Sequence, residues 1–238
     1  MSMYPRTRPF ELNYGTDERS VASFFNTVYA WMCVGLAVTA TVAYMVSQNT
    51  ALLVALNSRG VAVVMMLALV ALAWGIQGAA MRISPTVATA LFLLYAAMVG
   101  ALISYIFRIY PWQTIVAAFL VTGGTFGGMS VYGFVTKRDL SRMGSILVMA
   151  FWGLFLASIV NLFLGSSPLS WIITYGVLAV FIGMTAYDTQ RLREIAVQLQ
   201  SQGDGTLRAR YAIVGSLNLY VDFINIFLSI LRILGNRR

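Results

Sequence analysis

The sequence predicts an all-α membrane protein with seven transmembrane helices, and three observations support this. The chain of 238 residues is 59% hydrophobic and only 10% charged, with a mean hydropathy of +0.79, whereas roughly one-quarter of the residues in a soluble domain are charged. It contains seven apolar runs, each near the ~20 residues that cross a bilayer. No run alternates polar and apolar residues as a β-barrel strand would. The runs cover about residues 25–47, 60–81, 86–107, 114–135, 144–164, 169–189 and 212–234.

The connections between these runs are mostly short, which indicates one helical bundle. We therefore expect residues 21–238 to form a single transmembrane domain and residues 1–20 to form a cytoplasmic N-terminal tail. The tail is polar and contains Pro5 and Pro9, unlike a cleavable signal peptide with its apolar segment. The first run is expected to act as an uncleaved targeting signal.

The lysines and arginines predict the orientation of the chain, since they concentrate on the cytoplasmic side of membrane proteins. Eleven fall on one side of the seven-span topology: Arg6, Arg8, Arg19, Arg82, Lys137, Arg138, Arg142, Arg191, Arg193, Arg208 and Arg210. The other side has Arg59, Arg108, Arg237 and Arg238, and also Arg232 if it is counted. We therefore predict a cytoplasmic N-terminus and an external C-terminus. Topology alone accounts for the net charge of +8, so nucleic-acid binding is not expected.

Several chemistries are excluded by composition. Cys33 is the only cysteine and the chain has no histidine, which rules out Ser–His, Cys–His and histidine–metal sites. Any response between pH 5 and 8 must then come from carboxyl groups in unusual surroundings. The only lysine, Lys137, lies in a loop, so a retinal-type Schiff base within the membrane is excluded as well.

The fourth run contains four glycines, Gly123, Gly124, Gly127 and Gly128. Two overlapping small-xxx-small pairs of this kind allow close approach of another helix. We expect tight packing at this position, in preference to a gating hinge.

Asp222 lies inside the seventh apolar run, where a charge is costly and indicates a functional site. It belongs to a polar stripe on one face of the helix. Successive polar residues of the stripe are four, three, four and three positions apart, which places them on the same face. They are Asn218, Asp222, Asn225, Ser229 and Arg232. We predict that Asn218, Asn225 and Ser229 line an ion pathway. A stripe that only holds the bundle together is the alternative. Arg232 lies near the outer end and is expected to be an interfacial anchor.

Asp188 ends the sixth run and Arg82 ends the second, so both belong to the same cytoplasmic half as the start of the seventh run. Asp222 is roughly 15 Å along its helix from Ala212. The two acids can meet only if span seven starts beyond the membrane surface, if span six extends obliquely, or if a water-filled inlet exists. A buried pair of carboxylates would share one proton, with Arg82 as the competing partner of the ionised form. The simpler alternatives are an interfacial pair of Asp188 with Arg191 and a membrane anchor at Arg82.

Four segments resemble the bacterial branch of the Bax inhibitor-1 (transmembrane Bax inhibitor motif) family. They are "YGFVTKRDLS" at Tyr132–Ser141, "ASIVNLFL" at Ala157–Leu164, "GMTAYDTQRLR" at Gly183–Arg193 and "LNLYVDFINIFLSILRILGNRR" at Leu217–Arg238. The resemblance runs from about Val21 to the C-terminus. It implies a seven-helix fold with the seventh helix at the centre, and a calcium leak regulated by pH.

The resemblance also assigns roles to single residues. The family's di-aspartyl sensor maps onto Asp188 and Asp222, and the arginine that alternates as their partner in the closed state maps onto Arg82. An acidic residue of some relatives would fall near Ala71, so a second salt bridge built on it is missing here.

The function expected from the sequence is a pH-sensitive calcium leak channel of a bacterial inner membrane, without a cofactor and without enzymatic activity. Asp188 and Asp222 would bind calcium weakly and transiently, since two carboxylates fall short of the 6–8 oxygen ligands of a tight site. The expected partners are the lipid bilayer, calcium ions, protons and another membrane protein. A non-conducting regulatory protein, for example of a membrane protease, is the alternative. An intramembrane aspartyl protease is disfavoured, because Asp222 lies in "LYVDF" and not in Gly-x-Gly-Asp.

Overall fold

The fold is described from a computed structural model, which covers residues 14–56, 58–79, 83–200 and 204–236. All regular secondary structure in these ranges is α-helical, without strands. The helices are α1 (Tyr14–Gln48), α2 (Thr50–Leu56), α3 (Arg59–Ala79), α4 (Pro85–Ile103), α5 (Ile106–Ile109), α6 (Trp112–Val135), α7 (Ser141–Leu164), α8 (Ser167–Gln200) and α9 (Gly205–Gly235). Seven segments within these ranges are long and apolar enough to cross a membrane. The predicted all-α fold with seven spans is therefore confirmed.

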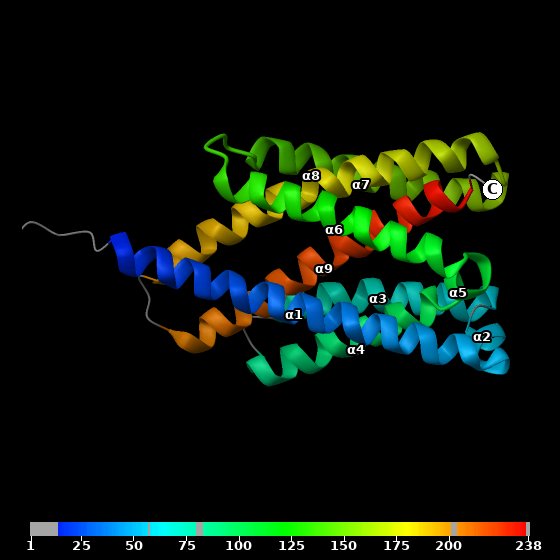
Figure 1. The fold of residues 1–238 in the computed structure, drawn as a ribbon, viewed down its shortest axis with the longest axis horizontal. Coiled ribbons are helices and arrows are strands. Elements are labelled where there is room, and N and C mark those ends of the chain that lie inside the picture. Colours follow the sequence, from blue (N-terminus) through cyan, green and yellow to red (C-terminus); the bar gives the residue numbers. More distant parts are fainter. Residues whose placement is uncertain (1–13, 57, 80–82, 201–203, 237–238) are drawn as a thin grey trace, which may run out of the picture.

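Helix α9 lies at the centre of the bundle, as expected. It packs against α1, α3, α4, α6 and α8, and Figure 1 shows it running between α1 and α4 on one side and α6 and α8 on the other. Within its most apolar stretch 61% of the residues are buried, whereas none are buried in that of α7. Helix α9 is therefore shielded from lipid, whereas α7 is exposed to lipid.

The ends of the bundle are named here after the helices found there. At the N-terminal end lie the start of α1 and the α6–α7 connection, and at the C-terminal end lie α2, α5 and the end of α9 (Figure 1). The start of α1 and the end of α9 therefore lie at opposite ends, as an odd number of spans requires.

Three helix boundaries lie well outside the predicted apolar runs, and the first is the start of α1 at Tyr14, where the run begins at about residue 25. Helix α8 continues to Gln200 where the apolar run ends near residue 189, and α9 begins at Gly205 where the next run begins at 212. Residues 190–200 mix polar and apolar types and contain neither Gly nor Pro, so helix propensity carries the helix beyond the apolar run. Asp204 starts α9, because its carboxylate accepts the backbone N–H groups of Thr206 and Leu207 at 2.8 and 3.2 Å.

The expectation of tight packing at the four glycines of α6 is wrong for the described part of this chain. A Cβ atom added at Gly123, Gly124, Gly127 or Gly128 would meet nothing within 4 Å. Helix α6 instead turns the face of Thr122, Phe126, Ser130 and Gly133 inward. A Cβ atom at Gly133 would strike the backbone of Ala186 on α8. The pattern of small residues identified a face without side chains but could not determine whether a helix or lipid covers it.

Candidate functional site

Asp188 on α8 and Asp222 on α9 are both buried, with 6% and 2% of their surfaces exposed. The two helices pack along one another more extensively than any other pair of described elements. The Asp188 carboxylate lies within electrostatic range of Asp222. The structure therefore brings together the two acids that the sequence singled out.

The extension of both helices explains how these acids meet. Asp188 lies about 18 Å before the end of α8, and Asp222 lies about 26 Å beyond the start of α9, given the observed helix bounds. Neither acid is at the tip of the helical hairpin. Helix α9 starts before its apolar run and α8 continues beyond its own, so both acids lie well inside their helices.

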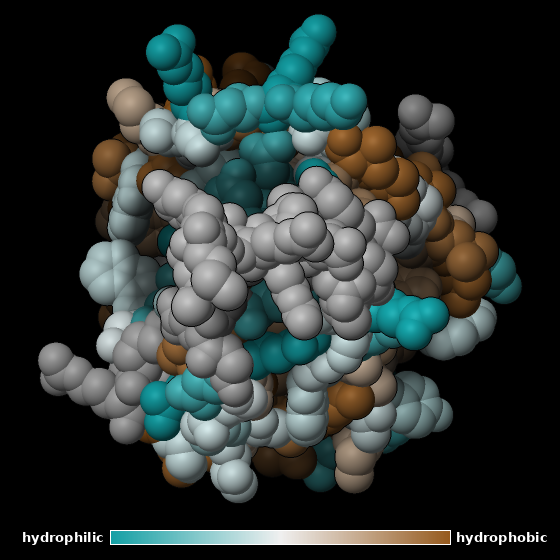
Figure 2. Space-filling model, turned by 90° about the vertical axis from the view of Figure 1, so that its left-hand side faces the viewer, coloured by the Kyte–Doolittle hydropathy of each residue, from teal (hydrophilic) through white to brown (hydrophobic). Residues whose placement is uncertain are grey.

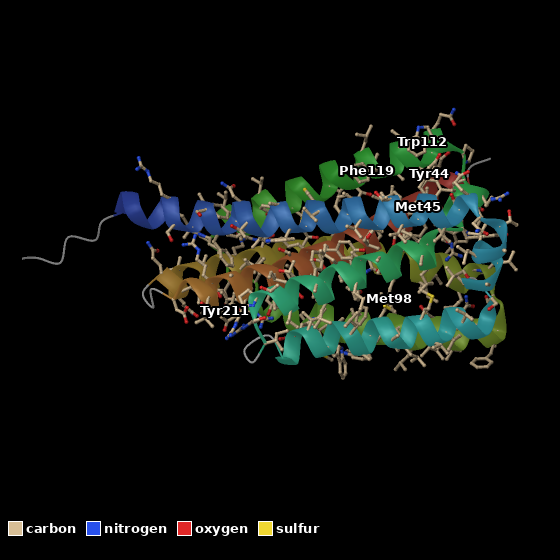
Figure 3. The ribbon with its side chains drawn as sticks, turned by 90° about the horizontal axis from the view of Figure 1, so that it is seen from below. Tyr44, Met45, Met98, Trp112, Phe119 and Tyr211 are labelled. Atoms are coloured by element: carbon tan, nitrogen blue, oxygen red, sulfur yellow. The ribbon has the colours of Figure 1, made fainter. Side chains whose placement is uncertain are left out.

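A cavity of about 180 Å³ reaches Asp188 from the N-terminal end of the bundle. We call this cavity the polar inlet, and it is lined by Gln77, Asp188, Arg191, Leu192, Ile195, Tyr211, Val214, Gly215 and Asn218. Figure 2 views this end and shows hydrophilic residues on it, and Figure 3 labels Tyr211, which comes from the first turns of α9. A cavity of this size and lining can hold several water molecules, so Asp188 lies between the inlet and the buried interior.

The polar stripe of α9 divides into parts with different surroundings. Asn218 lines the polar inlet. Asn225 donates from Nδ2 to the carbonyl oxygen of Val221 at 2.8 Å, and Ser229 donates from Oγ to that of Asn225 at 2.8 Å. Arg232 is exposed and its guanidinium lies 5.8 Å from the ring centre of Trp171. Only the first of the three predicted pathway residues therefore lines the inlet, because the other two bond to their own helix.

One oxygen of Asp222, Oδ2, is buried without a hydrogen-bond partner in the described ranges. A buried acceptor of this kind is destabilising unless a proton, a cation or another donor reaches it. Arg82, the predicted counter-charge, lies outside the described residues. Within the described part of the chain, Oδ2 of Asp222 can thus accept a proton or a positively charged ion.

A chain of hydroxyl groups holds α8 in place beside Asp188. Tyr29 donates to Ser130 at 3.0 Å, Ser130 and Thr189 are 3.1 Å apart, and Thr189 donates to the carbonyl oxygen of Thr185 at 2.7 Å. This network connects α1, α6 and α8. We interpret these as positioning residues, because they fix the turn of α8 that carries Asp188.

Gln190 forms a second clamp at the same level. Its Oε1 accepts the backbone N–H of Leu140 at 2.9 Å, and its Nε2 donates to the carbonyl oxygen of Arg138 at 2.8 Å. The α6–α7 connection is thereby tied to α8. Sequence reasoning missed this role, since Gln190 follows Asp188 as an ordinary polar residue and its partners are distant in the chain.

The sequence also missed Gln77 and Tyr211 in the lining of the inlet. They come from α3 and the first turns of α9, and no spacing rule connects them to Asp188. Arg191 carried a partial signal, because it lies three residues after Asp188 on the same helix face. An interfacial pair of Arg191 with Asp188 is the simpler alternative that the sequence leaves open, and the structure places Arg191 in the wall of the inlet.

The described residues contain no group of three or more His, Cys, Asp or Glu that could hold a metal ion. Fold and site together define an integral membrane protein of seven helices in which the last two bury a pair of carboxylates. Residues 21–238 match the family described as "Inhibitor of apoptosis-promoting Bax1". The chain belongs to this Bax inhibitor family.

Several bacterial relatives match over nearly their whole length. "Inner membrane protein YbhL" of Escherichia coli (strain K12) is 44% identical over 217 residues, covering 91% of this chain and 92% of the relative. A protein of Deinococcus radiodurans is 46% identical over 218 residues, covering 92% of each. "Uncharacterized protein YrjE" of Lactococcus lactis is 35% identical over 225 residues, covering 92% of this chain and 94% of the relative.

Proposed function

We propose that this protein is a pH-sensitive calcium leak channel gated by Asp188 and Asp222. The observation that carries the proposal is the burial of both carboxylates on the packed helices α8 and α9, with Asp188 in the lining of a polar inlet. A charge held at membrane depth marks an ion or proton pathway more often than a structural contact. Family membership supports the same function.

Calcium binding at this site is weak and transient in the proposed mechanism. Calcium takes 6–8 oxygen ligands, and the inlet offers the Asp188 carboxylate with the amide oxygens of Gln77 and Asn218. Water would supply the remaining ligands. An ion that is held loosely can leave again, which a leak requires.

The gate responds to pH because the acids can share one proton. Two carboxylates buried in close range repel one another when both are charged, so they titrate as a unit. Protonation exchanges the contact of a charged Asp with Arg82 for a hydrogen bond between the acids. Without histidine, this pair is the proposed source of any response between pH 5 and 8.

The decisive experiment is calcium flux into proteoliposomes from pH 5 to 8, comparing wild type with Asp222→Asn. We expect Asp222→Asn to abolish most of the pH dependence. Asp139→Asn is the matched control, because the backbone N–H of Ser141 donates to this exposed loop carboxylate and holds its pKa below the usual value. Asp139 is charged throughout the assay, so its loss should leave the profile unchanged. A folded Asp222→Asn variant with the wild-type profile would falsify the gating mechanism.

Two related measurements would favour one of the two alternative functions. Absence of flux from folded wild-type protein would favour the non-conducting regulatory protein. Cleavage of transmembrane peptides that depends on both aspartates would favour the intramembrane protease.

The proposed orientation has the N-terminus in the cytoplasm and the C-terminus outside, in a bacterial inner membrane. Its support is the excess of Lys and Arg on one side of the spans, and one relative is named an inner membrane protein. Reporter fusions should place the termini on opposite sides. Two fusions active on the same side would contradict the orientation and the seven-span topology together.

A further inference from the structure

A second cavity, of about 330 Å³, opens on the membrane-facing side of the bundle near its C-terminal end. We call this cavity the apolar groove. Its walls come from α1 and α6, and Phe223 and Phe227 of α9 form part of its floor. All of its lining side chains except that of Thr39 are apolar. The groove therefore excludes ions and suits a hydrocarbon ligand.

Helices α1 and α6 contact one another toward one end of the bundle and flank the apolar groove toward the other. Toward the N-terminal end Tyr29 bonds to Ser130, and the rings of Phe25 and Phe134 meet at 5.1 Å. Toward the C-terminal end both helices pack on α9, and the apolar groove lies between them.

Aromatic side chains make the walls rigid. Phe119 of α6 lies 5.5 Å from Phe223 and 6.4 Å from Phe227, measured between ring centres. At the deep end Thr39 is bonded to Tyr220 and to the carbonyl oxygen of Ala96, at 2.6 and 2.9 Å. The one polar lining residue is thus satisfied within the protein and does not require water in the groove.

The rim of the groove has the chemistry of a lipid headgroup region. The rings of Tyr44 and Phe107 lie 6.0 Å apart, and those of Phe107 and Trp112 stack at 6.4 Å. Figure 3 shows Tyr44, Trp112 and Phe119 near the same end. Such aromatic residues gather at the headgroup level of membranes. Arg108, the neighbour of Phe107 in the sequence, is exposed, and one N–H group of its guanidinium donates to Thr50 at 3.0 Å.

We propose that the apolar groove binds an acyl chain of an anionic phospholipid, whose phosphate is held by Arg108. The guanidinium offers five donors in a fork that matches a phosphate. The charge of Arg108 favours a lipid with net negative charge over a zwitterionic one. A helix of a second copy is a poorer occupant, because a helix is about 10–12 Å across and would have to separate α1 from α6.

The test uses tryptophan fluorescence in vesicles, with two single-tryptophan versions of the full chain. One retains Trp112 at the groove and the other retains Trp74 on α3, which is equally exposed at 64%. The remaining four tryptophans are replaced by Phe. Quenching by brominated phosphatidylglycerol is compared with quenching by phosphatidylcholine brominated at the same chain positions, so the depth of each tryptophan cancels in the ratio.

We expect a several-fold preference for phosphatidylglycerol at Trp112 and a ratio near one at Trp74. Arg108→Gln should return the Trp112 ratio to one, and Ala40→Leu, which fills the groove from an exposed lining position, should reduce quenching by both lipids. Equal ratios at the two tryptophans would overturn the proposal, as would a preference that survives both substitutions. Shielding of Trp112 from both lipids in a dimer would assign the groove to a second copy instead.

Discussion

The polar inlet and the apolar groove both border α9, yet their linings have opposite character. Helix α9 contributes Tyr211, Gly215 and Asn218 to the inlet, and Phe223, Ile224 and Phe227 to the groove. Asp222 lies between these two stretches. One helix therefore has a wet face in its first half and an apolar face in its second, with the buried acid at the boundary.

This difference shows why a polar stripe in a sequence does not by itself define a pathway. Asn225 and Ser229 continue the stripe into the second half but bond to the backbone of their own helix. They line neither the inlet nor the groove. The polar inlet therefore reaches Asp188 from the N-terminal end, and aromatic residues of α9 line the groove beyond Asp222.

The largest effect is expected when Asp188, the partner of Asp222, loses its carboxyl group. Asp188→Asn should bring the ratio of calcium flux between pH 5 and 8 to about one, because a single carboxyl group has no partner with which to share a proton. The double variant with Asp222→Asn should add little, as expected for groups that act as one unit. Flux in proteoliposomes measures both. Additive effects of the two substitutions would show that the acids act separately.

Removing the proposed counter-charge should have a smaller effect of a different kind. Arg82→Ala is expected to raise flux at neutral pH several-fold, because the closed state loses its partner for the ionised acid. Arg142→Ala is the control, since Arg142 is an exposed residue at the start of α7. Equal flux from the two variants would make Arg82 a membrane anchor only.

The packing of α6 against α8, the helix that carries Asp188, can be tested at Gly133. Gly133→Ala should lower the free energy of unfolding by about 1–3 kcal/mol, because the new methyl group meets the backbone of Ala186 on the helix that carries Asp188. Gly128→Ala, with open space around its Cβ atom, should be neutral or slightly stabilising. Thermal unfolding in detergent compares them. A matching loss at Gly128 would mean that another helix covers this face.

The smallest effect is expected at the deep end of the groove. Thr39→Val keeps the shape but leaves the buried Tyr220 hydroxyl without its bond to Thr39, which should lower the free energy of unfolding by about 1 kcal/mol. Thr41→Val is the control, since its exposed hydroxyl only bonds back to Ala37. Denaturation of both variants in detergent gives the comparison. Equal stabilities would show that the Thr39 bond contributes nothing measurable.

The sequence by itself determined the seven spans and the two acids. Whether about 20 residues prefer lipid to water is a property of those residues, and a carboxylate within such a run is conspicuous whatever surrounds it. The central position of α9 followed from the family resemblance, and its polar stripe is consistent with burial. Hydropathy placed the end of α8 too early, because the mixed polar and apolar residues after 189 extend this helix by propensity that hydropathy does not measure.

Only the tertiary structure decided which residues share a cavity. Gln77 of α3 and Tyr211 of α9 line the same cavity as Asp188 of α8, and the four glycines of α6 face outward while Gly133 faces α8. The apolar groove likewise depends on the separation of α1 from α6 above α9. In a membrane both lipid-facing and core-facing positions are apolar, so hydrophobic pattern distinguishes them poorly. The contacts of neighbouring helices therefore decide which face is turned inward and where a cavity remains.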